Sequence, residues 1–312
     1  MPITLQDTTK PQIGYLCIMC AAMLWALSGT TSKFLFQSGL TPLDLVQLRT
    51  TIGATALLVW LAVARLHLLR VERCSLPSLA LLGVLLAATQ FTYLFAVSRI
   101  HVAVAIVLQC QAPLFVALAT VAILRQRLAP RVCFALLGAT AGCYLMVGAH
   151  SLTDTGMDTL GVVSGLVSAG CFAAYTMRCE KGLTNNDPLT MVVYAMLVAA
   201  MIWNVFHPPF SAFAQLTSPS ILGLCLFVCI GGTVIPFWLY VKGVGLIGSA
   251  RGSITATLEP VVAGVAAYFL LGELLDIWQM LGGAIILSSL VLLQLHGKKQ
   301  GKELGSREEA FR

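Results

Sequence analysis

Charged residues are scarce in this sequence, and their scarcity excludes a water-soluble protein. Asp, Glu, Lys and Arg make up only 10% of it and hydrophobic residues 58%, whereas soluble domains average about 25% charged and about 45–50% apolar residues. The mean hydropathy of +0.88 agrees. No stretch between the apolar runs is long enough for a separate soluble domain, so we expect the whole chain of 312 residues to be organised around a membrane.

The sequence also lacks the motifs of nucleotide-driven pumps and of familiar hydrolases. It contains no phosphate-binding Walker loop, no GxSxG and no HExxH. The five histidines are scattered, and no cluster has the spacing of metal ligands. We therefore expect neither an enzyme nor a bound cofactor or metal. Cytoplasmic loops account for the net charge of +6, so nucleic-acid binding is not needed to explain it.

The ten cysteines do not indicate a disulfide framework or a metal site. They lie in or beside apolar runs, and no loop is long enough to need a disulfide. Cys17 and Cys20 have CxxC spacing, but that part of the chain offers no further ligands and no water-accessible site. We interpret the cysteines as small apolar packing residues.

Apolar runs bounded by Pro, Gly and charged residues predict ten transmembrane helices. Each is long enough to cross a hydrocarbon core of about 30 Å at about 1.5 Å per residue, and the bilayer leaves helix as the conformation that satisfies the backbone. The first run is longer than a signal-peptide core of about 7–15 residues, so we expect it to be retained. The runs fall at about 12–37, 42–65, 75–98, 101–124, 129–148, 158–179, 187–206, 218–242, 250–272 and 276–296.

The distribution of Lys and Arg predicts the orientation. With the N-terminus inside, sixteen of the 19 basic residues fall on the cytoplasmic side, and only Lys33 and Arg99 fall outside. The remaining one, Arg49, lies within the second run. By the positive-inside rule both termini face the cytoplasm of a multi-pass protein in the cell inner (plasma) membrane.

The two halves of the chain repeat each other. A shift of 147 positions places Gly14 on Gly161, Ile100 on Ile247 and Pro113 on Pro260, which indicates duplication. Five helices per half is an odd number, so the sequence predicts an all-α integral membrane fold of two inverted-topology five-helix repeats. We assign residues 1–11 to a cytoplasmic N-terminus, 12–148 and 158–296 to the repeats, 149–157 to an outer loop, and 297–312 to a mobile cytoplasmic tail that lacks an apolar pattern.

Several short motifs resemble those of a known family. They are Leu24-Trp25-Ala26-Leu27-Ser28, Pro42 with Arg49, Leu258-Glu259-Pro260 and Leu271-Gly272-Glu273. With these motifs, residues 12–296 resemble the EamA type of the drug/metabolite transporter superfamily. The resemblance implies a ten-helix fold with a central cavity, and substrates such as amino acids, other metabolites or drugs, often exported. Gln126 stands where the family often has the acid that Glu273 supplies in the second half.

Prolines near the middle of helices predict interruptions at matching places in the two halves. Pro113 and Pro260 each remove a backbone donor and free the carbonyls of Gln109 and Ala256. Paired helix breaks in inverted halves point to a substrate site at the membrane midplane, and the alternative is a packed proline kink. Gly231, Gly232 and Pro236 mark a similar weak point in the eighth predicted helix.

Glu259 is the one acid near the centre of a predicted helix, where an ionised side chain is unfavourable by about 2.5–3.5 kcal/mol. It either lines a cavity and binds an amino group or a proton, or it hydrogen-bonds a neighbouring helix. Thr255 and Gly252 should share its face of the helix. Arg49 either attracts a substrate carboxylate, or extends to the interface or pairs with Asp44.

Other polar and aromatic residues complete the predicted substrate site. An amide facing lipid would lack partners, so at least one of Gln90, Gln109 and Gln111 should face the cavity; bonding between helices is the alternative for each. Aromatic rings can stack on a ligand, and Trp25 with Ser28 is the preferred pair because both lie near mid-helix. The remaining candidates are Tyr93, Tyr175, Trp238 and Tyr240.

Together these features predict a secondary transporter that exports small metabolites, most readily amino acids or related compounds, by alternating access. Its partners are the small-molecule substrate and the lipid bilayer, with proton coupling through Glu259 as a hypothesis and the oligomeric state left open. Multidrug or cation efflux is an alternative that a larger, more aromatic cavity would favour. Two further alternatives are an intramembrane enzyme and a membrane receptor that does not transport. The enzyme should show at least two titratable groups that converge at one depth of the membrane. The receptor would have no need to retain helix breaks in both repeats.

Overall fold

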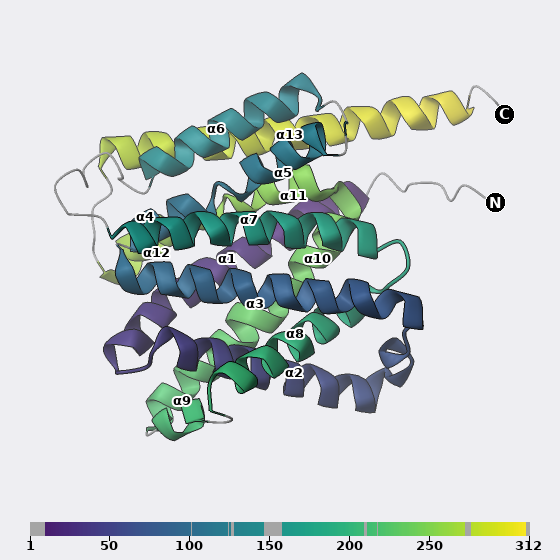
Figure 1. Cartoon of the computed structure of the whole chain (residues 1–312). Coiled ribbons are helices and arrows are strands. Elements are labelled where there is room, and N and C mark those ends of the chain that lie inside the picture. The colour runs from purple at the N-terminus through teal and green to yellow at the C-terminus, as the bar shows by residue number, and fades with distance from the viewer. Residues whose placement is uncertain are drawn as a thin grey trace.

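The computed structural model describes residues 10–100, 102–123, 125, 128–146, 158–208, 211–216, 218–271 and 276–309, and within them every regular element is helical (Figure 1). Short 3-10 helices span Leu66–Leu69, Arg73–Ser75 and Ser211–Gln215, and a π-helical segment, η5, spans Phe227–Val234. The α-helices are α1 (Lys10–Gln37), α2 (Pro42–Ala64), α3 (Leu76–Arg99), α4 (Val102–Gln109), α5 (Ala112–Ala122), α6 (Pro130–Met146), α7 (Thr159–Gly182), α8 (Pro188–Phe206), α9 (Pro219–Leu226), α10 (Ile235–Ile247), α11 (Ser249–Ala256), α12 (Glu259–Leu271) and α13 (Ile277–Glu309).

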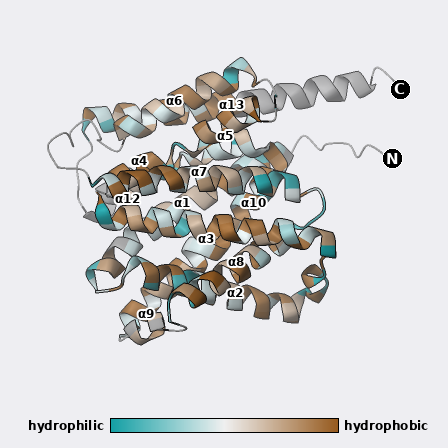
Figure 2. Cartoon of the chain, viewed as in Figure 1, coloured by the Kyte–Doolittle hydropathy of each residue, from teal (hydrophilic) through white to brown (hydrophobic). Residues whose placement is uncertain are grey.

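These helices make the chain a multi-pass membrane protein. Seven helices among the described residues are long and apolar enough to cross a membrane, and Pro130–Met146 and Ile277–Leu293 are apolar but shorter. Hydrophobic residues run along the helices, whereas hydrophilic ones gather near helix ends and in loops (Figure 2). Each predicted apolar run lies in one helix or in consecutive helices, while ten complete crossings remain a prediction.

The last helix is longer than the sequence predicted. We ended it at about residue 296, but α13 continues to Glu309. That extension holds three Lys and three Glu, which are good helix formers, and no proline interrupts it, although it also holds three Gly. Glu273, Gln126, the outer loop 149–157 and the first nine residues lie outside the described residues.

Equivalent helices of the two halves run in opposite directions. In α2 and α8, Gly53 faces Met196 while Gln47 bonds Asn204 (Nε2 to Oδ1, 3.1 Å), so residue numbers rise along one helix as they fall along the other. The fifth helices behave alike, because Gly138 and Gly142 of α6 pack against Ser289 and Ile286 of α13. Antiparallel equivalents are the geometry that inverted repeats require.

The first helix of each half makes the same contact with the other half. A Cβ at Gly14 of α1 would lie 2.6 Å from Ile247 Cγ2 of α10, and a Cβ at Gly161 of α7 would lie 2.7 Å from Cγ2 of Ile100, the residue that caps the end of α3. The shift of 147 positions relates both partners of one contact to both partners of the other. Each half therefore packs its first helix, at a glycine, against the third helix of the other half.

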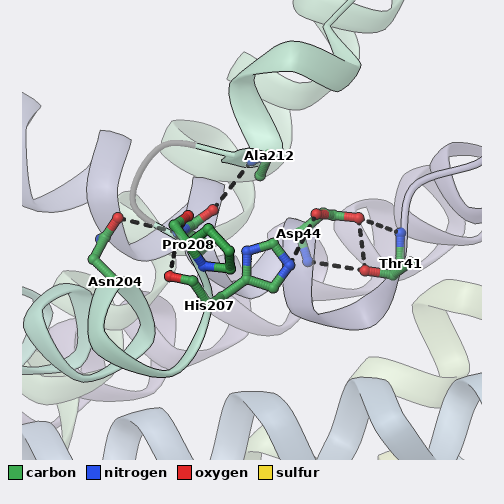
Figure 3. A network of polar contacts seen from close by, with 7 residues as sticks. Thr41, Asp44, Asn204, His207, Pro208 and Ala212 are labelled. Atoms are coloured by element: carbon green, nitrogen blue, oxygen red, sulfur yellow. Dashed lines mark hydrogen bonds and ion pairs between the residues drawn. The ribbon is translucent and has the colours of Figure 1, made fainter.

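Two connecting loops are tied across the halves in the same reciprocal way. The segment after α8 is held by Gln47 of α2, whose Nε2 donates to Pro208 O (3.0 Å) and whose Oε1 accepts from Ala212 N (3.2 Å), and His207 lies 3.5 Å from the Asp44 carboxylate (Figure 3). The segment after α2 is held by α8, because Thr190 Oγ1 donates to Leu68 O (2.8 Å) and Tyr194 Oη donates to Leu69 O (2.9 Å). We call these two contacts the loop clasps.

Candidate functional site

Two helices are interrupted at equivalent positions. α4 ends at Gln109 before α5 begins at Ala112, and α11 ends at Ala256 before α12 begins at Glu259. Pro113 and Pro260 are the second residues of α5 and α12, where a missing N–H has no helical partner to lose. The prolines therefore start new helical segments, and the breaks lie just before them.

At each break one backbone carbonyl accepts no hydrogen bond from a described backbone amide. The chain turns through three-residue bonds, from Gln111 N to Leu108 O (3.1 Å) and from Leu258 N to Thr255 O (3.2 Å). Within the described ranges no backbone amide donates to the carbonyls of Gln109 and Ala256, as the sequence predicted. Non-helical backbone is tolerated at membrane depth where it lines a cavity.

Pro236 does not interrupt its helix. The backbone passes from α9 through the π-helical segment η5 into α10 without a gap, and Pro236 is the second residue of α10. The predicted weak point appears instead as the π geometry, in which Thr233 Oγ1 donates to Val228 O five residues back (2.7 Å). Single π turns are frequent at functional sites. Gly232 of η5 touches α1 so closely that a Cβ there would overlap the side chain of Ser28.

A cavity lies between the two breaks. It has about 770 Å³ of empty space, including the open space at its mouth, and both halves of the chain line it. Its lining residues are Trp25, Ser28, Gly29 and Ser32 of α1, Arg49 of α2, Thr89, Gln90 and Tyr93 of α3, Gln109, Cys110, Ala112 and Pro113 at the first break, Phe172 of α7, Phe237 of α10, and Ser253, Ala256, Thr257 and Glu259 at the second break.

Arg49 and Glu259 bring opposite charges to this cavity. Arg49 is 7% exposed, and it donates from Nε to Thr233 Oγ1 (2.8 Å) and from Nη2 to Gly232 O (3.5 Å). Glu259 lines the same cavity, but the two described side chains form no ion pair within 4.0 Å. The contact of Arg49 with Asp44 that we considered is replaced by contacts with η5.

Two predicted glutamines line the cavity in different ways. Oε1 of Gln109 lies 2.5 Å from Ser168 Oγ, which joins the first break to α7. Gln90 is 4% exposed, and neither its Nε2 nor its Oε1 has a hydrogen-bond partner. Gln111 does not line the cavity; it lies in the first break, and its Nε2 donates to Val107 O of α4 (3.1 Å).

Aromatic side chains form one wall and the layer behind it. Trp25 packs edge-on against Phe172 (ring centroids 5.8 Å apart) and Phe237 (5.2 Å), and all three rings line the cavity. Tyr175 and Tyr240 do not line it; they are 1% and 0% exposed and contact the lining rings from behind. We call these five side chains the aromatic layer.

Two more predicted residues also lie away from the cavity. Thr255 is fully buried and donates to Arg251 O (2.8 Å), and Trp238 stacks with Lys242, whose Nζ is 5.5 Å from its ring centroid. The predicted common face of Gly252, Thr255 and Glu259 is wrong, because the helix breaks at Thr257 and Leu258 before it reaches the acid. Gly252 packs instead against Val244 and Ile18.

The sequence analysis missed several lining residues. Phe172 carried a signal, because it is the repeat equivalent of Trp25, and Ser32 lies one turn beyond Ser28. Phe237, Ser253, Cys110 and Thr257 carried none. Among the described residues, no group of three or more His, Cys, Asp or Glu side chains is placed to hold a metal ion.

The same two halves appear in comparisons with known proteins. The sequence pattern of the EamA-like transporter family matches residues 12–148 and again residues 159–295. The chain is 26% identical to the uncharacterized transporter YwfM of Bacillus subtilis, with 93% of this chain and 97% of YwfM covered. It is 24% identical to the threonine/homoserine exporter RhtA of Salmonella typhimurium, over 86% and 88% of the two chains.

A solved crystal structure shares the fold. Its TM-score is 0.73 at 17% sequence identity, and the match covers 92% of this chain and 98% of that chain. The solved fold covers both halves, and the family pattern occurs once in each of them. This chain belongs to the EamA-like transporter family.

Proposed function

We propose that this protein is a secondary transporter that exports amino acids or related small metabolites across the inner (plasma) membrane by alternating access. The observation that carries the proposal is a single cavity, bounded by two equivalent helix breaks, that presents a buried Arg49 and Glu259 together. Fixed charges of both signs suit a small zwitterion.

The chemistry of the cavity matches the two charged groups of an amino acid. Arg49 uses Nε and Nη2 on η5, and among the described residues no protein acceptor contacts its Nη1. A substrate carboxylate can accept from that side of the guanidinium in a charge-assisted bond. The substrate ammonium group then interacts with Glu259 and with the unpaired carbonyls at the breaks.

The orientation and direction of transport are part of the proposal. Ten crossings follow from the apolar runs, cytoplasmic termini from the Lys and Arg distribution, and inverted halves from the odd number of helices in each half. The antiparallel pairs α2 with α8 and α6 with α13 support the inversion. Export is supported by the name of the relative RhtA, a threonine/homoserine exporter. Proton exchange at Glu259 would couple export to the proton gradient.

Alternating access requires the aromatic layer to separate. In the proposed orientation Tyr175 and Tyr240 lie on the cytoplasmic side of the cavity, and Ser32, Arg49 and Tyr93 lie on its outer side. Rocking one half against the other would part the layer and admit substrate from the cytoplasm. Cation efflux is less well supported, because the buried cation of Arg49 repels a positively charged drug.

Transport by the purified full chain in liposomes tests the proposal. We expect radiolabelled neutral amino acids to move, and quaternary ammonium drugs not to move. The rate should respond to a pH gradient in the wild type and lose that response in Glu259→Gln. Drug movement without amino-acid movement would establish efflux instead, and a Glu259→Gln variant with an unchanged pH response would remove proton coupling.

A further inference from the structure

We infer that Gln90 determines specificity by forming hydrogen bonds to the side chain of the substrate. The preferred substrates are then amino acids whose side chain carries a neutral hydroxyl or amide. The inference rests on the proposed function, because it places an amino acid in the cavity. It adds the residue that distinguishes one amino acid from another.

The side-chain amide of Gln90 is buried at the cavity and has no hydrogen-bond partner among the described residues. The side chain is 4% exposed and lines the cavity, yet neither Nε2 nor Oε1 has a partner. Buried polar groups are nearly always hydrogen-bonded, so an unpaired donor and acceptor on one side chain require an explanation. A bound ligand supplies both partners.

Three other polar side chains of the cavity donate to backbone carbonyls three or four residues earlier in the chain. Thr89 Oγ1 donates to Leu85 O (2.7 Å), Ser32 Oγ to Ser28 O (2.8 Å) and Thr257 Oγ1 to Ile254 O (2.6 Å). Gln109 is engaged by Ser168. Among the described lining residues, Gln90 is thus the one whose side-chain donor and acceptor atoms are both buried without a partner.

The position of Gln90 assigns it to the side chain of the substrate. Arg49 and Glu259 are the charged lining residues and match the carboxylate and the ammonium group, which leaves the neutral amide for the remaining substituent. An amide offers one donor group and one acceptor. A hydroxyl or a second amide complements both, whereas an alkyl side chain would leave both buried and unpaired.

Transport of isosteric pairs in liposomes tests this assignment. Threonine and valine have nearly the same shape, and so do asparagine and leucine, but only the first of each pair can bond the amide. A site built to bond a hydroxyl rejects the analogue that lacks it by large factors, so we expect the wild-type kcat/KM for threonine to exceed that for valine by roughly tenfold or more. In Gln90→Leu that ratio should fall to about one, partly because valine transport improves.

The control is Gln279→Leu, which changes a glutamine of α13 outside the cavity whose Oε1 accepts from Asp276 N (3.0 Å). Its threonine-to-valine ratio should remain that of the wild type. Thermal unfolding distinguishes a role in specificity from a role in stability. Gln90→Leu removes two buried unpaired groups and should be at least as stable as the wild type. Gln90→Met provides a second variant of similar size.

The outcomes distinguish this inference from the proposed function. A wild type that carries valine as well as threonine, or a Gln90→Leu variant with an unchanged ratio, overturns the role of Gln90 and leaves amino-acid transport standing. A wild type that carries no amino acid overturns both. A large loss of stability in both Gln90 variants, with the ratio of each unchanged, assigns the residue to packing.

Discussion

Arg49 combines a place at the cavity with a structural contact that the sequence did not predict. It is held by Thr233 and Gly232 of η5, and it also lines the cavity. The hydrogen bond from Nε fixes the plane of the guanidinium, which leaves one side for a ligand. Arginine is suited to this double task because its five donors lie in a rigid plane.

A change of Arg49 to lysine should therefore impair binding even though the charge is kept. Lysine has a flexible ammonium group that cannot bond Thr233 and a carboxylate in the same fork geometry. We expect KM for transported amino acids to rise about tenfold or more in Arg49→Lys, by loss of roughly 1.5–3 kcal/mol of a charge-assisted bond. The exposed Arg65, at the end of the same helix, provides the control Arg65→Lys. Equal KM values in the two variants would contradict a carboxylate site at Arg49.

Gly232 should be required for the approach of η5 to α1. A Cβ there would overlap Ser28, so overpacking in Gly232→Ala should lower the free energy of unfolding by about 1–3 kcal/mol. Gly223→Ala, two turns earlier in α9 with nothing within 4 Å, should be neutral or slightly stabilising. Thermal unfolding in detergent measures both. Combining Gly232→Ala with Ser28→Gly should restore stability, and a double variant as unstable as the single one would place the strain elsewhere.

At the scale of elements, the two interrupted helices were partly predictable. Pro113 and Pro260, which the repeat relates to each other, predicted that both helices are interrupted and which carbonyls are freed. Their exact geometry could not be predicted, because the chain turns at Cys110–Gln111 and Thr257–Leu258, where no proline or glycine stands. Thr255 was misplaced for this reason: one regular helix was assumed across a break. The π geometry of η5 likewise has no established sequence signal beyond Gly231, Gly232 and Pro236.

Restoring a backbone donor at either break should stop transport. Pro113→Ala or Pro260→Ala supplies an N–H for the carbonyl four residues back, which favours a continuous helix through the cavity wall. We expect transport to fall at least tenfold while the folded protein remains as stable as the wild type or becomes more stable. Pro219→Ala, at the first position of α9, changes a proline whose donor is not needed and serves as control. Full activity in both break variants would show that the interruptions are dispensable.

At the scale of the whole molecule, the repeat predicted from residues such as Gly14 and Gly161 is visible as packing. The two glycines make the same contact in opposite halves, against Ile247 and Ile100. The sequence alone could not show which helices become neighbours, because a shift in register relates positions and not contacts. The partnership of α1 with α10 and of α7 with α3 required the structure.

Inverted halves place equivalent loops on opposite sides of the membrane. Leu66 lies in the loop after α2, and Ser218 lies in the equivalent loop after α8. With the native cysteines replaced, an impermeant thiol reagent applied to intact cells should label Ser218→Cys and not Leu66→Cys. Permeabilised cells, in which both should react, provide the control. Labelling of both positions in intact cells would mean that the halves are parallel and would remove the basis for alternating access.

The loop clasps have a consequence for how the chain is held as one molecule. Each clasp joins a loop of one half to the second helix of the other: Gln47 holds Pro208 and Ala212, and Thr190 holds Leu68. This is the exchange that two separate subunits make across a symmetric dimer interface. The covalent link between the halves is then a tether and not the source of their association. If the chain is split between α6 and α7 and the two halves are produced in the same cell, they should assemble and form the complete cavity.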